Sequence, residues 1–440
     1  MSFDNLGLSQ PVLQALALKE YTQATPIQTQ AIPILLKGKD LLGIAQTGTG
    51  KTAAFMLPSI DRLTQSDKRP QPRTCRMLVL APTRELASQI AESARGYARF
   101  SHMSVATVFG GTSIGKNRQD LSRGVDILVA TPGRLLDLIE QRYLDLKNVE
   151  ILVLDEADQM LDLGFIHALK AIVKMLPAKR QTLFFSATMP KTIRELADRF
   201  LTDPQQVAVT PIASTAERVE QFVTFVRQPE KTALLTLMVR YGFGPRGSME
   251  RVLVFSRTKH GADKIVKQLG MAGIAASAIH GNKSQPQRER ALAQFKAGTV
   301  PILIATDIAA RGIDVSGVSH VINYDLPNVA EQYVHRIGRT ARAGATGVAI
   351  AYCAEDERTY LRDIEKLTRQ KIDIEPLPEN FVHEAEKIRA ARPAEPLRVV
   401  RDDARREDRS RVRRPTSRRP DFGSAGAPKT NRSRRRASGR

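Results

Sequence analysis

Residues 41–57 read LLGIAQTGTGKTAAFML, an apolar run, then a glycine-rich loop, then a stretch of helix formers. A strand, a glycine loop and a helix in this order are typical of a P-loop. Glycines let backbone N–H groups turn toward phosphate oxygens, and the helix N-terminus adds its positive end. Lys51 would reach the β- and γ-phosphates and Thr52 would hold Mg²⁺. Ala45 replaces the first glycine of the general pattern GxxxxGK[ST].

An acidic pair follows the apolar run Ile151–Leu154. A carboxylate at the C-terminal end of a buried parallel strand lies beside the P-loop in such folds. Asp155 would hold Mg²⁺, and Glu156 would orient and deprotonate the attacking water. A solvated acidic turn is the alternative, but four apolar residues directly before the pair favour a catalytic role. The pattern therefore indicates hydrolysis of a nucleoside triphosphate.

Short apolar runs alternate with helical stretches from Leu41 to Tyr352. Continuous apolar strands that alternate with helices are typical of α/β domains, in which helices cover both faces of a parallel sheet. The alternation occurs in two series, which predicts domains at residues 1–208 and 219–375. Residues 209–218, rich in Pro, Ala, Ser and Thr, are predicted to be the linker.

Composition excludes several classes of protein. Cys75 and Cys353 lie far apart with no CxxC motif, so neither a disulfide framework nor a zinc site is expected. No run approaches the roughly 18 apolar residues of a membrane helix. The N-terminus lacks the basic and apolar regions of a secretory signal. We therefore expect a cytoplasmic protein without membrane attachment, and its net charge of +21 favours polyanionic partners.

An ordered series of motifs surrounds these residues. They are PTRELA (82–87), GG (110–111), TPGR (131–134), DEAD (155–158), SAT (186–188), VFSRT (254–258), Gln285 with Arg288, ATDIAARGID (305–314) and HRIGRTAR (335–342). From Phe3 to about Ile374 the chain resembles the DEAD-box ATP-dependent RNA helicases of superfamily 2. The segments MSFDNLGLS and AIHGNKSQ look most like the bacterial RhlE-type subgroup. The resemblance implies two tandem RecA-like parallel-sheet domains and RNA-stimulated ATP hydrolysis.

The resemblance also implies an ATP site. Gln28 resembles the glutamine that hydrogen-bonds the adenine edge, with Tyr21 and Phe3 packing nearby. Glu20 and Ala24 stand where the family usually has Gly and Pro, which loosens the match. The nucleotide-binding set that follows is Phe3, Tyr21, Gln28, Ala45, Gln46, Thr47, Gly48, Thr49, Gly50, Lys51, Thr52 and Asp314, with Thr52 and Asp155 as Mg²⁺ ligands.

The second domain would complete the catalytic site. Arg339 and Arg342 resemble arginine fingers, which neutralise transition-state charge at the γ-phosphate. His335 resembles the residue that links this motif to the DEAD acids, and Ala341 replaces the usual Gly. The predicted catalytic residues are Lys51, Asp155, Glu156, His335, Arg339 and Arg342.

RNA contacts are expected through the backbone. Hydroxyls, guanidinium groups and glycine-exposed amides suit phosphate contact and carry no base code, so binding should tolerate any sequence. Ser186 and Thr188 would couple the DEAD acids to the RNA site. The residues that match the family's RNA motifs are Thr83, Arg84, Gly111, Thr131, Gly133, Arg134, Arg257, Arg288 and Thr306.

Each domain carries only part of the ATPase site, so hydrolysis should require the cleft to close. If ATP and RNA both favour the closed form, each raises the affinity for the other. The resemblance implies local, non-processive unwinding of short RNA duplexes or remodelling of RNA–protein complexes, with ribosomal or RNA-decay assemblies as partners. An ATP-gated RNA clamp with incidental turnover is one alternative. A DNA helicase with a related core is another, and only the resemblance distinguishes RNA from DNA.

The C-terminal residues 376–440 are predicted to form a disordered basic tail, because they lose apolar periodicity and fill with Arg, Ser and Pro. From Asn380 onward 17 Arg and 2 Lys stand against 8 acidic residues, a local charge of +11. We favour an RNA tether that acts through counterion release. The alternative is a solvated charge run that only aids solubility.

Overall fold

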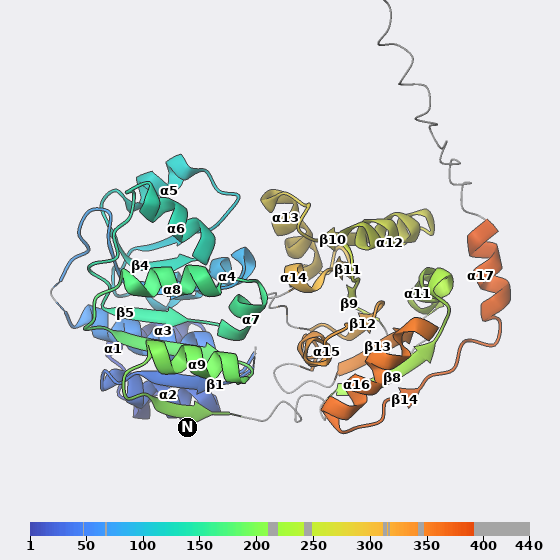
Figure 1. The fold of residues 1–440 in the computed structure, drawn as a ribbon, viewed down its shortest axis with the longest axis horizontal. Helices are drawn as coiled ribbons and strands as arrows, with labels where there is room; N and C mark the ends of the chain where they lie inside the picture. The colour runs from blue at the N-terminus through green and yellow to red at the C-terminus, as the bar shows by residue number, and fades with distance from the viewer. Residues whose placement is uncertain are drawn as a thin grey trace, which may run out of the picture. The chain divides into compact units, whose positions relative to one another are not determined.

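The computed structural model describes residues 1–46, 48–66, 68–209, 219–241, 249–310, 315, 317–341 and 347–390. Within them the chain forms two seven-stranded sheets whose strands all pair in parallel (Figure 1). Helices flank each sheet. The predicted α/β fold with two parallel-sheet domains is confirmed.

The first sheet has the strand order β3-β4-β2-β5-β6-β1-β7. Its strands are β1 (Leu41–Ile44), β2 (Cys75–Leu80), β3 (Val105–Val108), β4 (Val125–Ala130), β5 (Ile151–Leu154), β6 (Gln181–Ser186) and β7 (Gln205–Ala208). Its helices are α1 (Gln10–Leu18), α2 (Pro26–Leu36), α3 (Lys51–Thr64), α4 (Arg84–Tyr97), α5 (Ile114–Leu121), α6 (Pro132–Glu140), α7 (Ala157–Asp162), α8 (Ile166–Lys174) and α9 (Lys191–Phe200).

The second sheet has the order β10-β11-β9-β12-β13-β8-β14, which is the same order once β8 is counted as the first strand. Its strands are β8 (Val219–Phe225), β9 (Val252–Phe255), β10 (Ala276–Ile279), β11 (Ile302–Ala305), β12 (His320–Asn323), β13 (Gly347–Cys353) and β14 (Asp373–Ile374). Its helices are α11 (Lys231–Tyr241), α12 (Lys259–Met271), α13 (Gln285–Lys296), α14 (Asp307–Ala310), α15 (Ala330–Ile337), α16 (Arg358–Thr368) and α17 (Phe381–Ala390). The two domains are therefore topological repeats.

Burial on both faces explains why the strands read as unbroken apolar runs. In β2, Met77 and Val79 belong to one core cluster, whereas Leu78 and Leu80 belong to the cluster on the opposite face. Side chains alternate between the faces of a strand, so a strand covered on both sides is apolar at every position. Because all strands are parallel, the loops that follow them meet at one edge of each sheet, where ligands bind in such folds.

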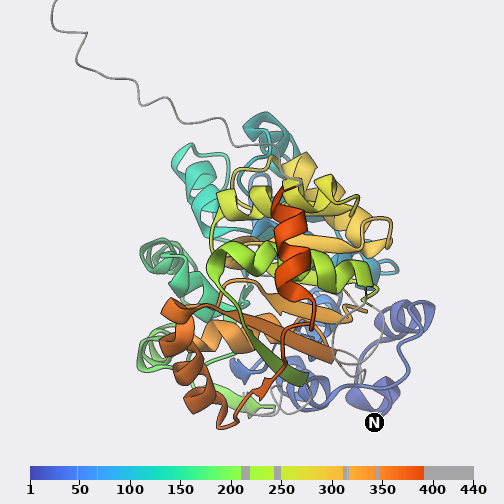
Figure 2. The same cartoon turned by 90° about the vertical axis from the view of Figure 1, so that its right-hand side faces the viewer.

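Ordered structure extends further toward the C-terminus than we expected. We predicted that a disordered tail begins at residue 376, but residues Phe381–Ala390 form helix α17, which packs against α11 (Figure 2). Phe381 and Ala385 are buried there, and Ile388 packs beside them. These residues recur at helical spacing and form an apolar stripe, which the high charge of the segment masks. Residues 391–440, like 210–218 of the predicted linker, lie outside the described residues.

None of the helices within the described ranges combines the length and the apolar composition that a bilayer crossing requires.

Candidate active site

The glycine-rich loop joins β1 to α3. Gly48 and Gly50 have φ values of +86° and +92°, in the left-handed region that glycine adopts at little cost. Gly50 caps α3, so Lys51 is the first residue of that helix. A Cβ at Gly50 would lie 2.4 Å from Nε2 of Gln28, so no larger residue fits without a shift. Within the loop, the Thr49 hydroxyl donates to the Gln46 carbonyl at 2.8 Å.

Lys51 connects the loop to the acidic strand end. Its Nζ donates to the Ala45 carbonyl at 3.0 Å and lies 3.8 Å from Oδ1 of Asp155. Ala45 therefore acts through its backbone, which explains why a glycine is not needed there. Burial raises the pKa of Asp155 to about 6, with Lys51 opposing the rise and Glu156 adding to it. The Asp155 carboxylate also accepts the amide of Glu156 at 3.0 Å.

Glu156 has a left-handed backbone, with φ 53° and ψ 52°, and is 1% exposed. A non-glycine residue in this region costs about 1–2 kcal/mol. Such conformations persist where the surrounding structure enforces them, and they cluster at functional sites. The turn lies at the point where β5 ends and α7 begins.

A cavity of about 490 Å³ lies beside these residues, a volume within the range of small-ligand sites. Eight of the predicted nucleotide-binding and catalytic residues line it: Tyr21, Gln28, Gly48, Gly50, Lys51, Thr52, Asp155 and Glu156. The cavity thus brings together residues that are up to 135 positions apart in the chain.

Phe3 is not part of this cavity. It is 3% exposed and packs in the hydrophobic core of the first domain, and its place near the adenine stays a prediction. The aromatic partner of Tyr21 is instead Tyr97 of α4, at a ring-centroid distance of 6.5 Å. Lys19 places its Nζ 5.4 Å from the Tyr97 ring. Tyr97 lies outside every short motif, so motif matching alone could not find it.

Gln28 ties the N-terminal segment to the glycine loop. Its Oε1 accepts the Thr25 amide at 2.9 Å, which forms a capping box at the start of α2. Its Nε2 donates to the Gly50 carbonyl at 3.1 Å. Glu20, where the family usually has Gly, has a φ of +58°. The departure from glycine therefore falls at a position with a left-handed backbone.

Asp158, which we did not predict as a site residue, binds the SAT motif (186–188) that we expected to couple the nucleotide and RNA sites. Asp158 accepts hydrogen bonds from the amide of Ala187, at 3.2 Å, and from the amide and hydroxyl of Thr188, at 3.0 and 2.9 Å. The Ser186 hydroxyl donates to the Thr188 carbonyl at 2.7 Å. The position of Asp158, three residues after Asp155, is the signal that could have identified it.

The motifs of the first domain that we predicted to bind RNA contact one another. Thr83 caps α4 by accepting the Leu86 amide, and the guanidinium of Arg84 packs so closely on Gly111 that a Cβ there would lie 2.4 Å away. Arg134 donates to the Thr112 carbonyl at 2.9 Å. Gly133 and Thr131 belong to the start of α6, and open space surrounds the Cβ position of Gly133. Its backbone is therefore accessible to a ligand.

The second domain repeats part of this arrangement. Thr258 caps α12 as Thr83 caps α4. The neighbouring Arg257 donates to Oε1 of Glu357 at 2.7 Å and to the Leu326 carbonyl at 3.2 Å. Thr306 directly precedes α14, and Arg288 lies in the first turn of α13.

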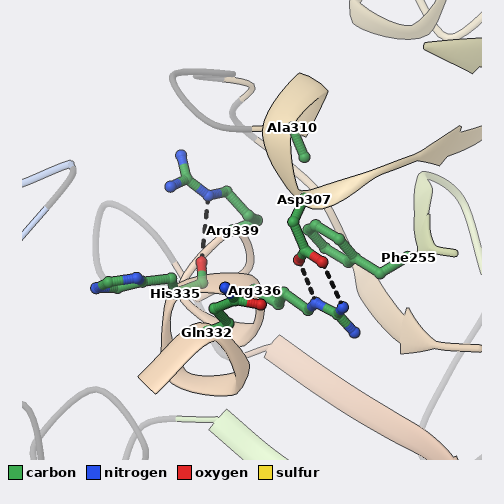
Figure 3. A pocket seen from close by; sticks show the side chains of 7 residues that line it. All are labelled: Phe255, Asp307, Ala310, Gln332, His335, Arg336 and Arg339. Carbon is green, nitrogen blue, oxygen red and sulfur yellow. Dashed lines mark hydrogen bonds and ion pairs between the residues drawn. The ribbon is translucent and has the colours of Figure 1, made fainter. Parts of the chain in front are cut away.

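Figure 3 shows the predicted catalytic side of the second domain, where a small pocket forms around Arg336. Arg336 binds both carboxylate oxygens of Asp307, at 2.6 and 2.7 Å, and its guanidinium lies 5.0 Å from the Phe255 ring. His335 and Arg339 project away from this pair, and Nε of Arg339 donates to the His335 carbonyl at 3.2 Å (Figure 3). Arg336 thus anchors the motif that carries Arg339. Thr47, Asp314 and Arg342 lie outside the described residues.

Family models and curated relatives both match this chain. The DEAD/DEAH box helicase model matches residues 25–196, and the helicase conserved C-terminal domain model matches residues 230–344. An ATP-dependent RNA helicase CshA of Listeria monocytogenes is 44% identical over 84% of this chain and 69% of its own. The DEAD-box ATP-dependent RNA helicase CshA of Bacillus subtilis is 42% identical over 85% and 74%. The name CshA gives no support to the RhlE-type subgroup.

Solved structures are similar as well. S. cerevisiae Dbp5 bound to RNA and ADP BeF3 is 29% identical, with a TM-score of 0.77, over 89% of this chain and 99% of its own. Mss116p bound to ssRNA and AMP-PNP is 26% identical, with a TM-score of 0.80, over 90% and 83%. Both neighbours were solved with a nucleotide or nucleotide analogue and with RNA.

Proposed function

Because the chain belongs to the DEAD-box family of ATP-dependent RNA helicases, we propose that RNA stimulates its ATP hydrolysis and that closure of its two domains separates short RNA duplexes locally. The observation that carries this proposal is the cavity lined by Lys51, Asp155 and Glu156. It is lined by the lysine that begins α3 and by two buried acids that follow one parallel strand, β5.

The first domain would bind ATP and Mg²⁺. Asp155 suits a cation, because its carboxylate is buried and Lys51, at 3.8 Å, only partly offsets the rise in its pKa. No cluster of three metal-ligating acids, histidines or cysteines occurs among the described residues, which fits an ion held by Asp155, Thr52 and the phosphates themselves. When bound, the ion would neutralise negative charge on the phosphates.

Glu156 would act as the general base. Its strained backbone places it in the cavity wall beside Asp155, and burial of its side chain keeps bulk water away from the proton transfer. Asp158 would position the SAT motif through its three hydrogen bonds to Ala187 and Thr188. We propose that Ser186 and Thr188 thereby couple the nucleotide site to RNA.

The second domain would supply Arg339 and Arg342 to the γ-phosphate, His335 to the DEAD acids and Asp314 to the ribose or the attacking water. Arg336 would act as a positioning residue, since its ion pair with Asp307 holds α15 against the start of α14. Because neither domain carries both the acids and the arginines, hydrolysis would require them to come together.

RNA would lie along the loops that contain the motif residues of both domains and would be contacted through its backbone. The arginine-rich residues after 390 would add a sequence-independent tether. We propose the cytoplasm, and ribosomal or RNA-decay assemblies within it, as the place of action.

Steady-state ATP hydrolysis with and without single-stranded RNA tests the proposal, with single-stranded DNA of the same length as the comparison. RNA should stimulate wild-type turnover strongly and DNA weakly. Glu156→Gln should abolish the stimulated rate while ATP still binds, and the exposed Glu195→Gln of α9 should behave as wild type. Turnover that ignores RNA, or a Glu156→Gln variant as fast as wild type, would contradict the proposal. Long-lived RNA complexes without unwinding would indicate a clamp instead.

A further inference from the structure

A second cavity, also of about 490 Å³, lies at the other edge of the first sheet. It is lined by Arg76 at the start of β2 and by the loops that precede β2, β5 and β6, three strands that are neighbours in the sheet. Because the strands are parallel, this amino edge is opposite the carboxyl edge that holds the glycine loop and the DEAD acids. Figure 1 shows β5 running away from it toward α7. No predicted catalytic, nucleotide-binding or RNA-binding residue lines this cavity.

The lining is strongly cationic. Among the described residues that line it, Glu150 is the one acid, against five cations: Lys68, Arg69, Arg76, Lys147 and Lys179. Glu150 already binds two of them, because its carboxylate accepts from Arg76 at 2.9 Å and from Lys68 at 3.3 Å. Arg69 and Lys179 have no hydrogen bond or ion pair within the described part of the chain and are exposed. Lys147 lies 3.5 Å from Asp145, so the unpaired positive charge of the cavity lies on Arg69 and Lys179.

Arg76 gives the cavity a buried floor. Arg76 is 4% exposed. Its Nε donates to the Glu150 carboxylate, and its Nη1 donates to the Leu63 carbonyl at 3.2 Å. Its Nη2 is buried and makes no hydrogen bond to any described residue. A buried donor without an acceptor is destabilising, because it loses its hydrogen bonds to water without replacement. An anion that enters the cavity would lie beside this buried guanidinium and would meet the exposed cations around it.

The remaining lining residues identify the kind of anion. Gln71 and Asn148 add amides, and none of the described residues that line the cavity is aromatic. Bases are held by stacking on aromatic rings, whereas phosphates and sugars are held by cations and amides. The lining therefore favours a phosphate over a base.

We propose that this cavity binds a backbone phosphate of RNA, in a segment outside the catalytic track. This inference rests on the proposed binding of RNA at the carboxyl edge. The two edges are separated by the length of β2, whose six residues span about 20 Å. A short RNA strand that binds only at the carboxyl edge cannot reach the cavity as well. The cavity should therefore bind only longer or structured RNA.

The test compares two full-length variants that each lose four positive charges from the first domain. The pocket variant carries Lys68→Gln, Arg69→Gln, Lys147→Gln and Lys179→Gln. The control carries Lys37→Gln, Lys191→Gln, Arg194→Gln and Arg199→Gln, all at exposed positions outside the cavity. Arg76 stays intact in both, because its buried ion pairs with Glu150 and Asp126 support the fold.

Affinity is measured for a single strand of about 8 nucleotides, a typical site size, and for a long hairpin RNA with single-stranded flanks. The pocket variant should bind the long RNA roughly 10-fold more weakly, with a shallower salt dependence, and bind the short strand as wild type does. The control should change neither affinity by more than about 2-fold. ATP hydrolysis stimulated by the short strand should be equal in all three proteins.

Equal long-RNA affinity in the pocket variant and the control would overturn the proposal. Thermal denaturation in the presence of inorganic pyrophosphate tests whether the phosphate comes from RNA or from a small molecule. If it stabilises wild type but not the pocket variant while long-RNA affinity is unchanged, the ligand is a small phosphate and not RNA. Failure of the short strand to stimulate wild-type ATP hydrolysis would instead contradict the proposed function, whatever the cavity binds.

Discussion

The two domains share one strand order but differ at the start of the helix that follows the first strand. In the first domain, a glycine loop leads from β1 into α3, which begins at Lys51. In the second, residues 226–230 lead from β8 into α11, which begins at Lys231. Each lysine faces an aspartate beyond the corresponding strand: Lys51 lies 3.8 Å from Asp155, and Lys231 lies 3.7 Å from Asp325.

The difference lies in what else reaches the lysine. Lys51 borders a cavity of about 490 Å³. Lys231 is 0% exposed and donates to the carboxylate of Glu357. That carboxylate also accepts the amides of Leu326 and Ala354, both at 3.1 Å, and the guanidinium of Arg257. A carboxylate of the chain itself thus supplies the anion in the second domain. We therefore infer that a lysine–aspartate pair can bind a nucleotide only where a glycine loop and a cavity lie beside it, as they do at Lys51.

The largest effect should follow from Lys51→Ala. We expect ATP turnover to fall by on the order of 10²–10³-fold, because the charge that stabilises the phosphates in the transition state is lost. The measurement is RNA-stimulated hydrolysis at saturating RNA. Lys37→Ala, an exposed control in the same domain, should leave the rate unchanged. A Lys51→Ala variant within a few-fold of wild type would show that this lysine does not bind the phosphates.

Glu357→Ala should affect stability rather than chemistry. It leaves Lys231 buried with only the more distant Asp325, and breaking a buried ion pair costs about 3–5 kcal/mol. Urea denaturation that reports on the second domain measures the loss. Glu355→Ala removes a carboxylate whose side chain is 85% exposed and should change stability little. A Glu357→Ala variant as stable as wild type would mean that the network contributes nothing.

Asp155→Asn should stabilise the nucleotide-free protein at pH 8. The folded pKa of Asp155, about 6, exceeds its ordinary 3.8, so the fold favours the protonated form. That contribution is complete below pH 4 and is lost as pH rises through 6, where the ionised group costs up to about 3 kcal/mol. The difference between variant and wild type, from denaturation at several pH values, should therefore grow between pH 4 and 6 and then stay constant. A difference independent of pH would contradict this.

The smallest effect concerns two departures from the family's glycines, one in each domain. Glu20 and Ala341 have φ values of +58° and +52°, so each strains its backbone. Glu20→Gly and Ala341→Gly should each raise the free energy of unfolding by about 0.5–1 kcal/mol. Ala272→Gly, where φ is −88°, should lower it. Equal effects of glycine at all three positions would show that the left-handed backbone imposes no cost.

Much of the fold and of the first domain's site could be predicted from the sequence. The P-loop and the DEAD acids adjoin strands that are apolar at every position. Such patterns are local in the sequence, so they can be recognised without knowledge of the tertiary structure. Glu357 and Tyr97 could not be found, because each acts through partners distant in the chain. The core position of Phe3 could not be predicted, because an aromatic ring gains as much from burial in the core as from a ligand. Helix α17 was missed because charge obscured its apolar stripe.

The central claim is that the chain has one nucleotide site, in the first domain, because Glu357 already supplies the anion in the second. Titration of the full-length protein with a fluorescent ATP analogue in the presence of Mg²⁺ measures the number of sites directly. We predict one molecule bound per chain in wild type and in Glu357→Gln, and none in Lys51→Ala at the same concentrations. Two molecules per chain, or binding that survives Lys51→Ala with unchanged affinity, would contradict the account.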